Sequence, residues 1–218
     1  MFERPLTRSE VELILRAQAF VREKHARSEQ HDFAHVMSVV RYALQIGRAI
    51  TDEVDPFVLI CGALFHDIGW IGTITGVLHG LRGATVVREY LSAVGVREDI
   101  IDRIIRVVIR HTVSSGLAPE RPEEKVVHDA DGLDALGLIG MLRGLIGKEG
   151  SIEEVIRGDI QLGAKTFERL YYPESRRLGE ALQRETEEVI VRFRTALDRR
   201  LRQIDDLALP LAKSARVS

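Results

Sequence analysis

The chain has 218 residues, of which 45% are hydrophobic and 29% are charged, and its formal net charge is −2. This composition is typical of a soluble globular protein that can bury a core, and the length favours one domain. A net charge so close to zero gives no general field for nucleic acid or an anionic membrane. We therefore expect neither as a partner, and any polyanion must be bound locally.

Local start signals place three helices in the first 70 residues. A capping box, Thr7-Arg-Ser-Glu10, precedes apolar positions at helical spacing and predicts a helix over residues 9–26. A second helix begins near residue 31 or 32, so that His35 lies in its first turns. Asp55-Pro56 opens a third helix, and Gly69 stops it.

The rest of the chain also shows helical periodicity, and no strand alternation is visible. We expect a last, long helix beyond Tyr172-Pro173, which serves as a packing strut or as the surface of a homodimer. The fold class is all-α, a single-domain helical bundle. The remaining predicted helices cover residues 78–93, 97–110, 123–130 with 133–146 continuing after it, and a helix that starts at the capping box 151–154.

Features of other protein classes are missing. Cys61 is the only cysteine, which excludes an intrachain disulfide framework. The stretch 68–81 has no charged residue, but it is too short and too rich in glycine to cross a bilayer. The first five residues lack a signal-peptide core. We expect a cytoplasmic protein with no membrane partner.

The most informative feature is His66-Asp67, which closes the apolar run 56–65. An imidazole and a carboxylate at the end of a buried segment are hard to explain as packing and are typical of metal ligands. His35 upstream and Asp131 downstream complete a set of four donors. Mixed nitrogen and oxygen donors suit manganese, iron, cobalt, nickel or zinc better than calcium, and we expect one or two divalent ions from this group or magnesium as the cofactor.

The order His35, His66-Asp67, Asp131 resembles the HD superfamily of metal-dependent phosphohydrolases over about residues 30–143. The block 63–69 is similar to the family's ALLHDIG, and the block 129–137 is similar to its DADRLDAIG, with Gly132 where an arginine is common. The resemblance implies one HD-type domain over residues 1–218. Its core is 30–143, with the N-terminal and C-terminal helices packed on it.

Two further histidines resemble the version of the family that holds two metal ions. His79 stands in an LHGxxGA element and His111 in an IRxHT element, so the resemblance implies a second ion with Asp67 as the bridge. A surface role, or direct phosphate binding by His79, is the alternative. Trp70 replaces the usual lysine after HDxG, and the HDxxED signature of alarmone hydrolases is absent.

Other polar residues near these motifs receive weaker predictions. Arg82 and Arg110 are the arginines nearest to His79 and His111 in sequence and are candidates to hold phosphates. His31 is a candidate substrate contact. Asp134, one helical turn after Asp131, orients a ligand, acts as a general acid, or is simply a capping or solvated aspartate.

Three more polar residues are expected to have no direct role in the site, and one alternative motif is disfavoured. We expect His128 and Asp129 to be solvated or to lie behind the ligands, and His25 to belong to an exposed basic helix end. His31 and His35 are four apart, as in the HExxH zinc helix. However, Asp32 replaces the glutamate with a shorter side chain, which disfavours a metalloprotease.

The sequence thus predicts a divalent-metal-dependent phosphohydrolase that cleaves a phosphoester or phosphoanhydride bond by metal-activated water, with Asp67 and Asp134 as catalytic residues. The resemblance implies a nucleotide as the phosphorylated substrate and one or two ions as cofactor. Two alternatives stay open. One is a non-catalytic sensor that keeps the metal and binds a nucleotide. The other is a helical scaffold stabilised by metal.

Overall fold

The structure is a computed structural model that describes residues 2–26, 28, 31–71, 78–146 and 148–214. Side chains are described up to residue 204, except that of residue 159. Within these ranges the chain is helical, and the only strand-like pairing is a single parallel bridge between Phe2 and Val54. The predicted all-α class is confirmed. The helices are α1 (Arg8–His25), α2 (Phe33–Ala49), α3 (Pro56–Phe65), η1 (Ile68–Trp70), α4 (His79–Ala93), α5 (Glu98–Arg110), η2 (Val113–Ser115), α6 (Pro122–Asp134), α7 (Gly137–Leu145), α8 (Ile152–Glu168) and α9 (Pro173–Ser214).

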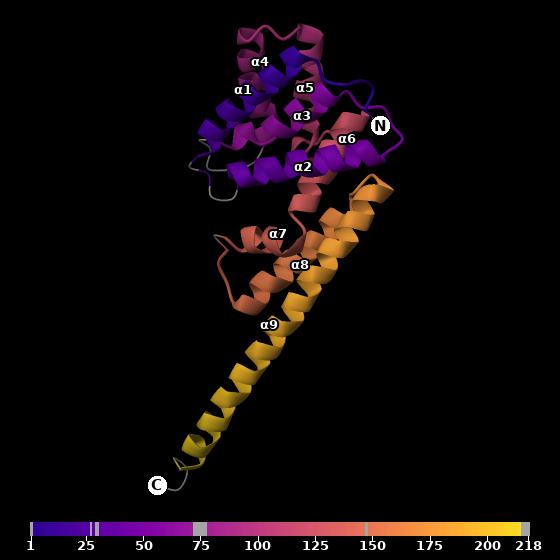
Figure 1. The fold of residues 1–218 in the computed structure, drawn as a ribbon. Helices are drawn as coiled ribbons and strands as arrows, with labels where there is room; N and C mark the ends of the chain where they lie inside the picture. The colour runs from indigo at the N-terminus through magenta and orange to yellow at the C-terminus, as the bar shows by residue number, and fades with distance from the viewer. Residues whose placement is uncertain (1, 27, 29–30, 72–77, 147, 215–218) are drawn as a thin grey trace.

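The apolar helix α3 lies at the centre of the fold. All ten of its residues are buried, as expected of a helix that is hydrophobic all round. It contacts α1, α2, α5 and α6, while α4 packs on α5 (Figure 1). Helices α7, α8 and α9 form a second group beside α6, and the far half of α9 extends away from the body (Figure 1). The polar pair that follows α3 is therefore carried into the interior.

The start signals read from the sequence are confirmed. Thr7 and Glu10 form the capping box of α1. Asp32 caps α2, and its side chain accepts the backbone N–H of His35 at 2.8 Å. Asp55 caps α3, with proline at the first helical position. Each cap is a contact between residues two or three apart, so the sequence alone is enough to predict it.

Two predicted helix boundaries are wrong. The third helix ends at Phe65 rather than at Gly69, and residues 68–70 form the separate turn η1. Helix α6 continues through residues 131 and 132, where a break was expected, and ends at Asp134. The chain turns at Leu136, which is extended, and at Gly137, whose φ of +76° favours glycine. The turn depends on Gly137, which the sequence analysis did not use as a helix stop.

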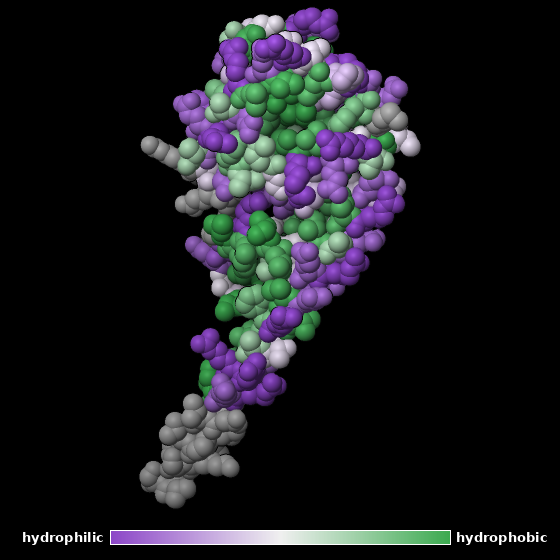
Figure 2. Space-filling view, in the orientation of Figure 1, coloured by the Kyte–Doolittle hydropathy of each residue, from purple (hydrophilic) through white to green (hydrophobic). Residues whose placement is uncertain are grey.

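The surface of α7, α8 and α9 carries many exposed apolar side chains. They include Ile139, Leu142, Ile152 and Phe193, each more than half exposed. Figure 2 shows hydrophobic side chains gathered over this part of the molecule. Patches of this kind mark interaction surfaces, and the homodimer stays a prediction. No helix in the described ranges has the length and apolar character needed to cross a membrane. Residues 72–77 of the charge-free stretch lie outside the described ranges.

Candidate metal centre

Three elements bring the four predicted donors together. His35 lies in the first turn of α2, His66 and Asp67 follow α3, and Asp131 lies in α6. The Nε2 atoms of His35 and His66 are 3.1 Å apart, and they lie 3.2 and 3.3 Å from Asp67 Oδ2. Asp131 Oδ1 is 3.6 Å from the His35 nitrogen and 3.9 Å from the His66 nitrogen. These donor atoms therefore face one point.

The other oxygen of the same carboxylate faces a second group. His79 opens α4 and His111 follows α5, and their Nε2 atoms are 3.1 Å apart. Asp67 Oδ1 lies 3.2 Å from the His79 nitrogen and 3.6 Å from the His111 nitrogen. Asp67 thus stands between two histidine pairs with one oxygen toward each.

Gly69 makes this second group possible. A Cβ at Gly69 would lie 2.0 Å from the carbonyl oxygen of His79 and 2.5 Å from the backbone nitrogen of Gly83. Only glycine lets the backbones of η1 and α4 approach this closely. The approach brings His79 within reach of Asp67, two residues before Gly69.

Hydrogen bonds on the far side of the rings fix which nitrogen faces the centre. The Nδ1 atom of His66 donates to the carbonyl of Ala63 at 2.8 Å, and that of His111 donates to the carbonyl of Val108 at 2.7 Å. The Nδ1 atom of His35 donates to Asp134 at 2.7 Å. In a neutral imidazole the remaining nitrogen, Nε2, then presents a lone pair, which is the form that ligates metals.

The donor sets fit divalent metal ions. Two lone pairs that face each other at 3.1 Å cannot form a hydrogen bond unless one nitrogen takes up a proton. Ligands about 2.1 Å from a shared ion lie about 3.0 Å apart at right angles and about 3.4 Å apart in a tetrahedron. The donor atoms of His35, His66 and Asp67 lie 3.1–3.3 Å apart and those of His79, His111 and Asp67 lie 3.1–3.6 Å apart, close to this spacing.

The electrostatics of the cluster favour a positive charge inside it. Burial alone would lower the pKa of His35, but its contacts with Asp134 and Asp67 raise the pKa to about 10. Burial would raise the pKa of Asp67, yet the charge of His66 and hydrogen bonds from neighbouring histidines hold it well below its usual range. Burial lowers the pKa of His111. A buried carboxylate among imidazoles therefore attracts a proton or a metal ion.

Of the roles open to Asp134, orientation of a ligand fits the geometry best. Its side chain is 6% exposed and contacts His35 Nδ1 and the guanidinium of Arg143. Burial would raise its pKa, but these partners and a hydrogen bond from Ser38 lower the pKa to about 2. An ionised carboxylate has no proton to donate, so the geometry does not favour the general-acid role.

The weaker candidates occupy different places. His31 Nδ1 lies 2.5 Å from Asp67 Oδ2, and its ring stacks on Trp70 with centroids 4.3 Å apart. The His31 side chain is 25% exposed, so it lies at an open side of the cluster. Arg82 Nε donates to the Gly69 carbonyl at 3.2 Å. Arg110 binds Glu120 and the carbonyl of Ala118. Their phosphate-binding roles stay predictions.

Two further polar residues, of which His25 was expected at an exposed helix end, are buried. His25 is 1% exposed, and its Nδ1 lies 2.5 Å from the carbonyl oxygen of His31. Asp129 is fully buried and accepts the backbone N–H groups of Tyr171 and Tyr172, so it ties the start of α9 to α6. The expected exposure of His25 is wrong, and of the two alternatives for Asp129 the solvated one is wrong, because these contacts join segments far apart or in a loop. Neither contact leaves a local sequence pattern.

Comparisons with known proteins agree with this geometry. A family model described as HD domain matches residues 32–136. The chain is 32% identical over 128 residues to a tRNA (cytidine(56)-2'-O)-methyltransferase of Picrophilus torridus, with 52% of this chain and 34% of the relative covered. It is also 32% identical over 120 residues to the uncharacterized protein YpgQ of Bacillus subtilis, with 53% and 56% covered. The chain thus spans about a third and a little over half of these curated relatives.

Solved structures share the fold. The crystal structure of YpgQ in complex with ADP has a TM-score of 0.66 at 21% identity, and the match covers 84% of this chain and 97% of that one. An HD-superfamily hydrolase from Bacillus thuringiensis has a TM-score of 0.67 at 20% identity and covers 87% and 98%. At these identities the likeness establishes the fold alone.

Proposed function

Because this chain is an HD-domain protein, we propose that it is a divalent-metal-dependent phosphohydrolase that cleaves a phosphoester or phosphoanhydride bond of a nucleotide. One observation carries the proposal. Two pairs of histidine Nε2 atoms, each pair 3.1 Å apart, face the two oxygens of the single buried carboxylate of Asp67.

The residues of the cluster form two groups, one for each ion. His35, His66, Asp131 and one oxygen of Asp67 would hold one ion, and His79, His111 and the other oxygen would hold a second. A bound divalent ion supplies Lewis acidity and lowers the pKa of water from about 15.7 to about 7, which provides hydroxide at neutral pH. Because all of these side chains except Asp131 are nearly fully buried, their positions are fixed before substrate arrives.

The open side of the cluster is where a substrate would enter. Asp131 and His31, with side chains 33% and 25% exposed, are the cluster residues that reach solvent. The ring of His31 stacks on Trp70 and its Nδ1 donates to Asp67, so in the imidazolium form its Nε2–H would be able to donate a hydrogen bond to a phosphate oxygen. A nucleotide as substrate is supported by the relative YpgQ, which was crystallised with ADP.

A turnover assay tests the proposal. The full chain, loaded in turn with manganese, cobalt, nickel, zinc or magnesium, is incubated with nucleoside mono-, di- and triphosphates, and released phosphate and pyrophosphate are followed. Release of either product, lost in Asp67→Ala with helix content retained, supports hydrolysis. Tight nucleotide binding without turnover for every metal would refute it and favour the sensor. A large loss of melting temperature on chelation, with no nucleotide bound, would favour the scaffold.

A further inference from the structure

Arg143, in α7, reaches the far side of the metal centre. Its guanidinium contacts Asp134 Oδ2, and its Nη1 lies 3.0 Å from His35 Nδ1. The Arg143 side chain is 19% exposed and the Asp134 side chain is 6% exposed. One oxygen of Asp134 therefore receives both the guanidinium and the imidazole.

We propose that Arg143 is a positioning residue of the metal centre, which acts through Asp134 to aim His35 Nε2 at the other donors. The proposal rests on the metal centre described under the proposed function. An arginine has only donors, so it cannot accept the Nδ1–H of His35. It can only hold Asp134 in place as the acceptor. The ring of His35 is then fixed in the orientation that leaves Nε2 toward His66 and Asp67.

The backbone of α7 places Arg143 by close packing against α6. A Cβ at Gly140 would lie 2.3 Å from the carbonyl carbon and oxygen of Ala135, so the first turn of α7 lies directly on the end of α6. Arg143 follows Gly140 by three residues, about one helical turn. The close approach therefore brings its side chain back over Asp134.

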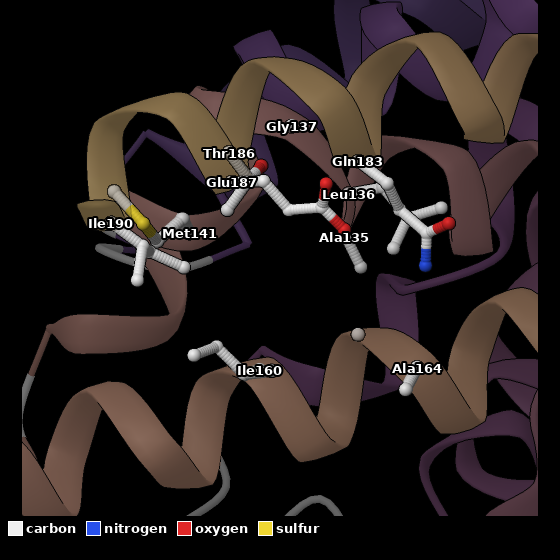
Figure 3. Close-up of a pocket in the computed structure, with 11 residues that line it drawn as sticks. Ala135, Leu136, Gly137, Met141, Ile160, Ala164, Gln183, Thr186, Glu187 and Ile190 are labelled. Carbon is white, nitrogen blue, oxygen red and sulfur yellow. The ribbon is translucent and has the colours of Figure 1, made fainter.

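The C-terminal helices support α7 from the other side. A Cβ at Gly137 would lie 2.9 Å from the Leu182 side chain of α9, and Met141 lies beside Ile190 of the same helix (Figure 3). A cavity of about 130 Å³ with mostly apolar walls lies between α7, α8 and α9, and Ile160 of α8 lines the side opposite Met141 and Ile190 (Figure 3). The three helices thus carry Arg143 to the centre, although none of the predicted ligands lies on them.

Substitution of Arg143 by methionine tests the proposal, because methionine keeps an unbranched apolar stem and removes every donor. Partners that orient a ligating histidine are typically worth about 10- to 100-fold in metal affinity. We expect Arg143→Met to weaken Mn²⁺ binding by this factor in isothermal titration calorimetry. The visible absorption of the Co²⁺-loaded protein should change as well. Arg143→Lys should recover part of the affinity, since an ammonium can still contact Asp134.

A double-mutant cycle separates positioning through Asp134 from other roles. If Arg143 acts through Asp134, Arg143→Met should have almost no further effect on Mn²⁺ affinity in an Asp134→Asn background. Additive effects, or wild-type Mn²⁺ affinity in Arg143→Met, would overturn the proposal. So would a variant in which only the KM for nucleotide rises, because Arg143 would then be a substrate contact.

Two controls guard against a general loss of stability. Arg157→Met removes an exposed arginine of α8 that pairs with Glu153 and should leave Mn²⁺ affinity unchanged. Val21→Ala, at a fully buried position of α1, should lower the melting temperature without weakening Mn²⁺ binding. Affinity for Mn²⁺ is read without any substrate. A failure to find hydrolysis would therefore refute the proposed function and leave the role of Arg143 testable.

Discussion

The contact at Gly69 allows a selective test of the second ion position. In Gly69→Ala the new Cβ would start 2.0 Å from the carbonyl oxygen of His79, whereas real Cβ atoms essentially never come within 3.0 Å of such an atom. The obstructing atoms are backbone, so no side chain can turn aside. The backbones of η1 and α4 must therefore separate by at least about 1 Å, at a cost of about 1–3 kcal/mol.

The separation acts on one ion position more than on the other. Asp67 Oδ1 and His79 Nε2, now 3.2 Å apart, would move to about 4.2 Å if the shift passes to the side chains. That is the greatest distance at which two ligands, each about 2.1 Å from a shared ion, can both bind it. His35, His66 and Asp131 do not lie on α4, so the first position should survive.

Metal stoichiometry measures this outcome. After equilibration with Mn²⁺ and removal of free metal, mass spectrometry of the wild type should give two ions per chain, and Gly69→Ala should give one. Gly158→Ala is the matched control, because a Cβ there meets no atom within 4 Å. Two tightly held ions in Gly69→Ala, or a single ion in the wild type, would refute the reasoning.

Three further predictions concern the charged groups of the centre. Asp67→Ala should lose bound metal at both positions, because its two oxygens face both histidine pairs; elemental analysis with circular dichroism checks this, and retained metal would contradict it. Chelation should lower the melting temperature of the wild type but not of Asp67→Ala, which has lost both ion positions, since an ion at 100 times its Kd contributes about 2.7 kcal/mol; equal shifts in both would contradict site-specific binding. In the metal-free chain, the burial of Asp134 is outweighed by contacts with His35, Ser38 and Arg143, which lower its folded pKa to about 2, below its usual value of 3.8. Its contribution of about 2 kcal/mol should be present above pH 3.8 and lost as the pH falls toward 2. Denaturant unfolding of the wild type and of Asp134→Asn should therefore differ at pH 7 and converge in acid; a constant difference would contradict the assignment.

The sequence predicted the helices and the donors because both leave local marks. Helix starts are marked by caps between residues two or three apart, as at Asp32 and Asp55. The donors stand in short motifs, and His66 directly precedes Asp67. That these motifs meet around one carboxylate was inferred from a family resemblance, since no local rule relates His35 to Asp131.

Contacts between distant segments were beyond the sequence. The end of α6 was misplaced because the turn depends on the φ of Gly137 and on the contact of Gly140 with Ala135. Arg143 was missed for the same reason. Its role follows only from the return of α7 onto α6, and an arginine in an amphipathic helix otherwise reads as a solvated residue.

The cluster at the end of α3 is costly for stability, which is itself evidence for a functional role. His66, Asp67 and His111 are each at most 2% exposed, and the first two follow a helix whose ten residues are all apolar or small and buried. A buried polar group without a proper hydrogen bond costs about 1–3 kcal/mol, so apolar side chains of similar volume would stabilise this interior. The facing Nε2 atoms find satisfactory partners only when a proton or a metal ion lies between them. A chain under selection for stability alone would not keep this arrangement, whereas a chain that must hold a divalent ion requires it.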